Sequence, residues 1–419
     1  MKIRNLLLSA LMGISVNTDV LAEESPPPNI WPSYVEGLVP LGERMADQIS
    51  EPKDPLLRQE MYKFVYEILA QGYFALLYQD TRHPDFWPVF NQAYPVGFAN
   101  PDDAYYQAVV DDTGVYKISG FRGTSYIVDF QVGSGEFSPF GRGKLGPTLS
   151  NYDLDHEAHF KKDGSFEVIL SPERPKGYKG DWWRLKPTAT FIWVRQMSYD
   201  WVHEVDGRFA IERLDTPAIK PRDNADKIAE QLKQIPQWTQ AWVNFGLHWS
   251  DQLRAKGLIN KVAVFDWSNQ GGVSTQRYIQ GIFDIQPDEA LIIETEIPKP
   301  CKYWAFQLAN EQTDTIDWIN RQSTLNGHFA RLDKDGKFRA VISAKDPGVP
   351  NWLDVADYQR GLIVGRWKEC ASYPEPTVQK VNVADVRKYL PKETPVVTLA
   401  ERDAHIRVMR KAVQLRRRW

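Results

Sequence analysis

Two stretches of this chain run through the same series of features in the same order, and this repetition constrains the fold more than any other property of the sequence. Each stretch has an Asp-Gly turn, a strand-like run ending in Ser, a proline-containing loop with a Trp, and a closing strand-like run that ends at Arg. An Asp-Gly pair between strand-like runs is a hairpin signal. The sequence therefore predicts an internal duplication of a β unit. The features fall at Asp163-Gly164, Ser171, Trp182 and Arg195 in the first stretch and at Asp335-Gly336, Ser343, Trp352 and Arg366 in the second.

Helical patterns surround the two strand-rich stretches. Apolar residues recur at intervals of three and four in residues 61–69 and along residues 224–256, where Pro236 predicts a break. Duplicated sheets packed face to face bury alternating strands, so we predict a mainly β protein, α+β overall, with two jelly-roll-like units. The predicted organisation is a linker and helical N-terminal segment at 23–100, a first β unit at 101–217, a linking helix at 218–260, a second β unit at 261–382 and a helical tail at 383–419.

Residues 1–22 have the pattern of a cleaved secretory signal peptide. Lys2 and Arg4 precede an apolar run at residues 6–16, and small residues ending at Ala22 provide a cleavage site. The alternative is a membrane anchor, but an apolar run of about 11 residues is too short for a bilayer that requires ~20. We expect a periplasmic or secreted protein without a transmembrane segment.

Export would place Cys301 and Cys370, the chain's two cysteines, in an oxidising compartment where they can pair. Cys301 precedes the strand-like run 303–308, and Cys370 follows the run 361–367. If these strands are antiparallel neighbours, both thiols lie at the same end of the pair. A disulfide there would close a loop of about 69 residues and stabilise the fold by ~4 kcal/mol in the chain-entropy model. The alternative is two free buried thiols.

The run from Asp346 to Asp354, followed by Gly361 and Arg366-Trp367, resembles the signature of the domain-of-unknown-function family 1214. Tyr303-Trp304, residues 323–326, residues 100–105 and the tail from 390 to 419 are similar to the family as well. The resemblance covers most of the chain after residue 22 and implies two jelly-roll-like β units with helical additions. It implies no chemistry, since no catalytic residues are established for the family. Its usual companion, family 1254, is not evident.

The loop from Asp346 to Asp354 is the best candidate for chemistry. Its prolines and glycine make it a stiff turn at the end of a β unit, where functional groups are often placed. Asp346 and Asp354 are predicted to form an acid/base pair, with Arg366 holding a substrate carboxylate or phosphate. The structural alternative has Asp346 capping a turn, Asn351 satisfying the loop backbone, Trp352 closing the β unit, and Arg366 paired with Asp354.

The first β unit offers a counterpart to this loop. Asp181 and Trp182 occupy places equivalent to Asn351 and Trp352, and we treat all four as candidate ligand-binding residues. A site at the interface of the two copies would draw on both of them. The alternative is that each loop closes its own β unit.

Several classes of function are excluded or disfavoured. A net charge of −3 provides no global field for nucleic acid. The seven histidines include no spacing that suits a metal, so we expect no metal and no cofactor. The glycine-rich residues 133–146 lack a Gly-Lys-Ser/Thr ending and are interpreted as a surface loop or lid. Homo-oligomerisation is left open.

The chain has 15 tryptophans, which suggest an aromatic ligand surface. We interpret most of them as core, including the helical stripe Trp238, Trp242 and Trp249, and retain Trp182 and Trp352 as ligand contacts. The leading hypothesis is an exported enzyme that acts on a small apolar or glycan-like molecule in an aromatic pocket. The alternative is a non-catalytic periplasmic binding or assembly protein.

Overall fold

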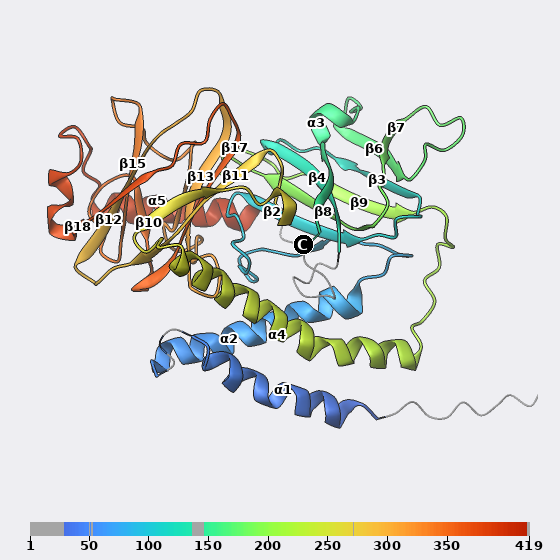
Figure 1. The fold of residues 1–419 in the computed structure, drawn as a ribbon. Coiled ribbons are helices and arrows are strands. Elements are labelled where there is room, and N and C mark those ends of the chain that lie inside the picture. Colours follow the sequence, from blue (N-terminus) through green and yellow to red (C-terminus); the bar gives the residue numbers. More distant parts are fainter. Residues whose placement is uncertain (1–28, 50, 52, 136–145, 271, 417–419) are drawn as a thin grey trace, which may run out of the picture.

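The computed structural model describes residues 29–49, 51, 53–135, 146–270 and 272–416. The predicted signal peptide, residues 136–145 of the glycine-rich segment and residues 417–419 lie outside this description. Two β units lie side by side, and a layer of helices runs beneath both of them (Figure 1).

Within the described residues, the strands fall into two sets of nine that lie in sequence on either side of the long helix α4 (Ala225–Ala255). The first unit contains β1 (Trp87–Pro88), β2 (Asp103–Val109), β3 (Tyr116–Phe121), β4 (Ile127–Ser134), β5 (Thr148–Asp153), α3 (Leu154–Glu157), β6 (Ser165–Ser171), β7 (Asp181–Arg184), β8 (Ala189–Met197) and β9 (Arg208–Arg213). The second unit contains β10 (Lys261–Phe265), η2 (Ser268–Gln270), β11 (Gln276–Asp284), β12 (Glu289–Glu296), β13 (Cys301–Ala309), β14 (Thr324–Asn326), β15 (Lys337–Ser343), β16 (Trp352–Asp354), β17 (Arg360–Cys370) and β18 (Thr377–Asn382).

The two units have the same topology. In the first, a five-stranded sheet of order β1-β2-β8-β4-β5 packs on a four-stranded sheet of order β7-β6-β3-β9. In the second, the orders are β10-β11-β17-β13-β14 and β16-β15-β12-β18, so every strand has its equivalent nine places later. Each pair of sheets encloses its own apolar core, around Phe130 and Trp183 in one unit and around Phe306 and Trp367 in the other. The predicted duplicated, mainly β fold is confirmed.

The helical layer forms because each helix buries an apolar stripe, and side-chain caps start two of the three helices. α1 (Trp31–Ala46) and α2 (Pro55–Gly72) precede the first unit, and α2 continues into a π-helical turn, η1 (Tyr73–Tyr78). The Asp54 side chain caps α2, and the Asn224 side chain caps α4. α1, α2 and α4 bury residues in one cluster with β8 of the first unit, and Leu253 of α4 packs with β11 and β17 of the second unit. The break predicted at Pro236 is wrong, because α4 continues through this proline.

The C-terminal segment is only partly helical. A 3-10 turn, η3 (Val383–Lys388), is followed by a proline-containing stretch and then by α5 (Leu399–Leu415). Thr398 and Glu401 form a capping box that starts α5. The prolines at 391 and 395 explain why the predicted tail is not one continuous helix.

The two five-stranded sheets contact each other through polar and apolar groups. Lys368 Nζ of β17 lies 2.8 Å from Asp129 Oδ2 of β4, and both side chains are buried. Tyr303 of β13 donates from its hydroxyl to Asp102 at 2.6 Å. β4 is buried along its whole length because one face covers its own core and the other contacts the second unit. The units are therefore held in a fixed relation.

β13 and β17 are antiparallel neighbours, and Cys301 stands opposite Cys370 in their register. A disulfide joins the two residues at the end of this strand pair. No helix among the described residues is long and apolar enough to cross a bilayer.

Candidate ligand-binding site

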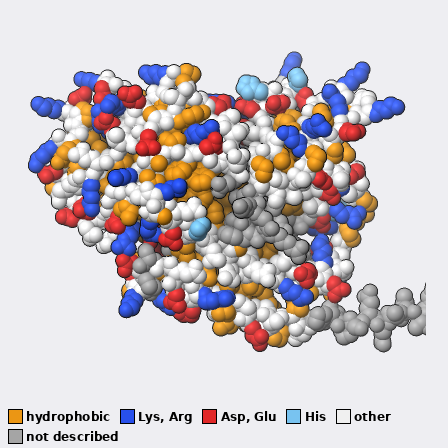
Figure 2. Space-filling model, viewed as in Figure 1, with side chains coloured by type: hydrophobic (Ala, Val, Ile, Leu, Met, Phe, Trp, Pro, Cys, Tyr) orange, Lys and Arg blue, Asp and Glu red, His pale blue; other side chains and the backbone are white. Residues whose placement is uncertain are grey.

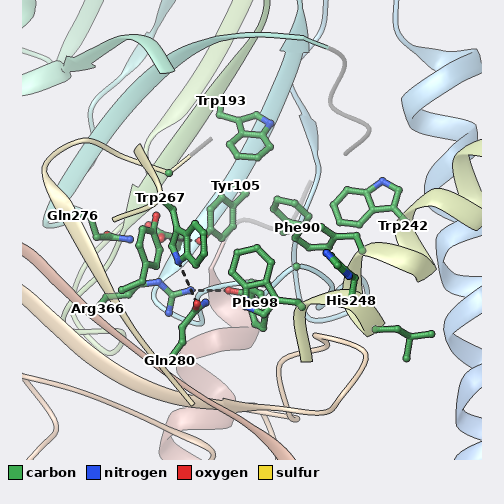
Figure 3. Close-up of a pocket in the computed structure, with 18 of the residues that line it drawn as sticks. Phe90, Phe98, Tyr105, Trp193, Trp242, His248, Trp267, Gln276, Gln280 and Arg366 are labelled. Atoms are coloured by element: carbon green, nitrogen blue, oxygen red, sulfur yellow. Dashed lines mark hydrogen bonds between the residues drawn. The ribbon is translucent and has the colours of Figure 1, made fainter. Parts of the chain in front are cut away.

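A cavity of about 1070 Å³ lies where the two five-stranded sheets and α4 meet. Its walls come from β2 and β8 of the first unit, β11 and β17 of the second unit, and the middle of α4 (Figure 3). Hydrophobic side chains gather at the surface in the middle of the molecule, between the two β units (Figure 2). The volume suits a sizeable small molecule.

Equivalent strands of the two copies line this cavity with equivalent residues. Tyr105 of β2 stands opposite Arg195 of β8, and Tyr278 of β11 stands opposite Arg366 of β17. Directly opposed residues in an antiparallel pair share one face of the sheet. Each copy therefore presents a tyrosine and an arginine to the same space, and all four residues line it.

Arg366 is held by neutral oxygens. Its Nη2 donates to the Phe98 carbonyl at 2.7 Å, and its Nη1 donates to Gln307 Oε1. The side chain is 4% exposed, and no carboxylate of the described chain forms an ion pair with it. Figure 3 shows the guanidinium directed at the backbone next to Phe98. These bonds fix the orientation of Arg366 and leave its charge uncompensated.

Arg195 is less constrained than its counterpart. Its guanidinium carbon lies 4.9 Å from the ring centroid of Trp193 and 6.0 Å from that of Tyr105. Within the part of the chain that the structure describes, it has neither a hydrogen bond nor an ion pair, and its Nη1 is buried. Asp129 stands directly opposite Arg195 on β4, but Lys368 binds that carboxylate. Arg195 is thus a cation stacked on aromatic rings, with no ion-pair partner among the described residues.

Asp103 brings one carboxylate to the cavity. Its Oδ2 accepts hydrogen bonds from Asn100 at 2.9 Å and from the Tyr105 hydroxyl at 3.0 Å. Its Oδ1 is buried and has no hydrogen-bond partner. Burial raises the pKa of Asp103 despite the opposing influence of Arg195 and Arg366. Two guanidinium groups therefore face one carboxylate, and the inner wall of the cavity is net positive.

Aromatic rings form much of the remaining wall. Phe90 and Trp193 make an edge-on contact with centroids 5.7 Å apart, and Trp249 and Trp267 lie 4.6 Å apart. The Trp267 indole donates to Gln280 at 3.2 Å, so one amide is fixed toward the cavity. Such walls bind flat or apolar groups, while the amides and guanidinium groups bind polar ends.

The predicted acid/base pair lies elsewhere. Asp346 accepts from the Gly348 amide at 2.8 Å and forms an ion pair with Arg402 of α5 at 3.0 Å. Asp354 forms an ion pair with Arg321 at 2.9 Å, and burial raises its pKa. Neither aspartate lines the cavity, whereas Arg366 does. The structural alternative paired Arg366 with Asp354, but this pair is not formed, because Arg321 pairs with Asp354 and Arg366 bonds to Gln307 and Phe98.

The four predicted ligand-binding residues have partners within their own β unit. Trp182 Nε1 donates to Ser171 Oγ at 3.0 Å, and Trp352 Nε1 donates to Ser343 Oγ at 3.1 Å. Repetition of this contact in both copies agrees with the alternative in which each loop closes its own unit. Asn351 donates to the backbone carbonyls of Arg331 and Arg339, and Asp181 accepts from His159. None of the four lines the cavity.

Sequence reasoning missed most of the cavity. Trp242 is buried in the core and Trp249 packs against a core cluster, as expected, but both also line the cavity, as do Tyr105, Tyr278 and Arg195. A signal was present, since the repeat aligns Arg195 with Arg366. Among the described residues, no group of three or more His, Cys, Asp or Glu side chains is arranged to hold a metal ion.

Comparison with known proteins confirms the family resemblance for part of the chain. Residues 286–366 match the family described as Protein of unknown function (DUF1214). No curated protein matches the sequence.

Solved structures that align with this one include the following two. An uncharacterized protein from Burkholderia cenocepacia aligns with a TM-score of 0.77 at 25% identity, covering 84% of this chain and 97% of that one. The VPA0106 protein from Vibrio parahaemolyticus aligns with a TM-score of 0.44 at 12% identity, covering 81% of this chain and 100% of that one. The first supports the fold described above.

Proposed function

We propose that the cavity binds a small amphipathic molecule with an acidic group, and that Arg195 holds this group. The observation that carries the proposal is the Arg195 guanidinium, which is stacked on Trp193 and has neither a hydrogen bond nor an ion pair to any described residue. Arg195 is partly exposed but its Nη1 is buried, and burying a charged donor is costly unless an anion or hydrogen-bond acceptor compensates it. A ligand carboxylate would supply two acceptor oxygens in the planar arrangement that guanidinium prefers.

The rest of the ligand is expected to be apolar, aromatic or glycan-like. Trp193, Phe90 and Trp242 provide faces and edges for ring stacking, and Gln276 and Gln280 can bond to hydroxyl groups. The aromatic side chains would bind the body of the ligand, and the arginines would bind its acidic group. Binding without turnover is the function that this geometry supports best.

The test compares 3-phenylpropanoate with its uncharged amide, using tryptophan fluorescence and calorimetry. The carboxylate should bind more tightly, and Arg195→Gln should lower its affinity about tenfold to a hundredfold, because hydrogen bonds to charged groups contribute about 1.5–3 kcal/mol. Arg208→Gln is the matched control, since Arg208 also stacks on an aromatic ring, Phe121, but lies outside the cavity. Equal binding of acid and amide, or equal losses in both variants, would contradict the proposal.

Catalysis is the second candidate, and Asp103 is the residue that favours it. A carboxyl group with a raised pKa next to a tyrosine hydroxyl is suited to proton transfer. If the protein is an enzyme, a ligand that binds should be converted, and mass spectrometry of the incubated mixture would detect the product. An unchanged ligand after long incubation would leave binding as the function.

We also propose that the protein is exported to the periplasm or beyond. The pattern of residues 1–22 supports this, and the Cys301–Cys370 disulfide agrees with an oxidising compartment. N-terminal sequencing of protein recovered from the extracytoplasmic fraction should begin at Glu23. Recovery of protein with an intact N-terminus from the cytoplasm would refute export.

A further inference from the structure

The polar end of the cavity contains an acceptor and a donor that do not bond to each other. Asp103 lies on β2 two residues before Tyr105, and Tyr105 stands opposite Arg195 on β8. The two charged side chains are therefore diagonal neighbours on one sheet face, at a typical separation of about 7–8 Å between their Cα atoms. The described chain forms no ion pair between them, although Arg195 acts electrostatically on Asp103, and both side chains line the same cavity.

Asp103 and Arg195 each have a buried polar atom without a hydrogen-bond partner, and the two atoms need opposite partners. Asp103 Oδ1 is a buried acceptor without a donor, and Arg195 Nη1 is a buried donor without an acceptor. Asn100 and Tyr105 occupy only the other oxygen of Asp103. A ligand that satisfied both groups would need an acidic acceptor and a hydrogen-bond donor close together.

From this geometry we infer that the ligand is a hydroxy acid, whose carboxylate binds Arg195 and whose adjacent hydroxyl donates to Asp103. This inference rests on the proposed function and adds the chemical class of the polar end. The ligand hydroxyl would lie over the sheet face that β2 and β8 form, and the body of the molecule would extend along Trp193 and Phe90 toward Trp242. Arg195 would then bind the carboxylate of any acid, and Asp103 would favour those acids that carry an adjacent hydroxyl group.

The charge of the cavity favours a hydroxyl over an amino group as the donor. Arg195 and Arg366 contribute two positive charges, and Asp103 contributes one negative charge. A hydroxy acid adds one negative charge and makes the sum zero, whereas a zwitterionic amino acid leaves the site positive. Asp251 also lines the cavity, but Arg254 pairs with it at 3.0 Å and compensates its charge.

The experiment measures the affinity of the whole wild-type protein for three probes by calorimetry. The probes are 2-hydroxy-3-phenylpropanoate, 3-phenylpropanoate and phenylalanine, which share the ring and the acid and differ only at the neighbouring carbon. The hydroxy acid should bind about tenfold more tightly than the deoxy acid, because its hydroxyl satisfies a buried charged acceptor. It should also bind more tightly than phenylalanine.

A variant assigns the preference to Asp103. In Asp103→Ala, the hydroxy acid and the deoxy acid should bind equally, while Asp181→Ala, a carboxylate of the same β unit outside the cavity, should keep the preference. Equal binding of the two acids by the wild-type protein would overturn the hydroxy-acid inference and leave the anion site intact. Tightest binding of phenylalanine would overturn it as well. If no acid bound in an Arg195-dependent manner, the proposed function itself would fail.

Discussion

Replacing Lys368 by methionine removes the cation of the buried ion pair between the two β units. Lys368 Nζ lies 2.8 Å from Asp129 Oδ2, and the side chains are 2% and 4% exposed. The Asp129 carboxylate has no other hydrogen bond within the described chain, so the variant leaves a buried carboxylate unpaired. Removing one partner of such a pair typically costs about 3–5 kcal/mol, a large part of the ~5–15 kcal/mol that stabilises a typical protein.

The assay is urea unfolding at pH 7, followed by tryptophan fluorescence. Lys368→Met should lower the free energy of unfolding by about 3 kcal/mol or more. The double variant Lys368→Met/Asp129→Leu should recover most of this loss, because both charges are removed together. Lys337→Met, which breaks the partly exposed pair with Glu294, is the control and should have little effect.

Two results would refute this reasoning. A loss below about 1 kcal/mol for Lys368→Met would mean that the carboxylate is solvated or finds another cation. A double variant as unstable as the sum of the single variants would mean that the two charges act independently. Either result would remove this ion pair as a constraint between the units and would weaken the explanation for why Arg195 lacks a counter-ion.

Two further predictions concern α5 and the pH dependence of folding. Arg402→Met should lower the free energy of unfolding by about 3 kcal/mol, because Asp346, whose side chain is only 11% exposed, loses its cation, whereas Arg407→Met, at an exposed pair on the same helix, should leave the urea midpoint unchanged. Burial raises the pKa of Asp102 to about 6, so its protonated form stabilises the folded state; this contribution is complete below about pH 4 and is lost as the pH rises through about 6. Asp102→Asn should flatten the stability profile between these pH values, and an unchanged profile in a pH series of urea unfolding curves would contradict the assignment to Asp102.

The fold could be predicted because its signals are local. Asp-Gly turns, runs ending in Ser and proline-containing loops each determine a short piece of backbone, and their repetition revealed the duplication. The helical stripe from Trp238 to Trp249 also predicted α4. The sequence did not predict that Pro236 would be tolerated inside this helix, because the contacts with α1, α2 and the β units that hold it are tertiary.

The site was harder to predict because turn chemistry is the same in structural and functional loops. Asp, Pro, Gly and Asn in the 346–354 loop fit a candidate site, and they equally fit a turn whose polar atoms are satisfied by neighbours such as Arg402 and Arg321. The tyrosines and arginines of the cavity lie within strands, where the sequence does not distinguish a binding residue from a structural one. Contact between the two five-stranded sheets brings these residues together, and strand patterns alone do not specify that contact.

The duplication also explains why the polar end of the cavity belongs to the first copy. Arg366 and Arg195 occupy equivalent positions, but Gln307 binds Arg366, whereas its equivalent in the first copy, Gln131, donates to Thr148. The register also makes Gln276 of the second copy the equivalent of Asp103, so the first copy alone places a carboxylate at this position. Arg366 is thus a fixed part of the cavity wall, whereas Arg195 remains available next to Asp103, whose Oδ1 has no hydrogen-bond partner. An elongated ligand should therefore bind in one orientation across the two related halves, with its acidic end at β2 and β8.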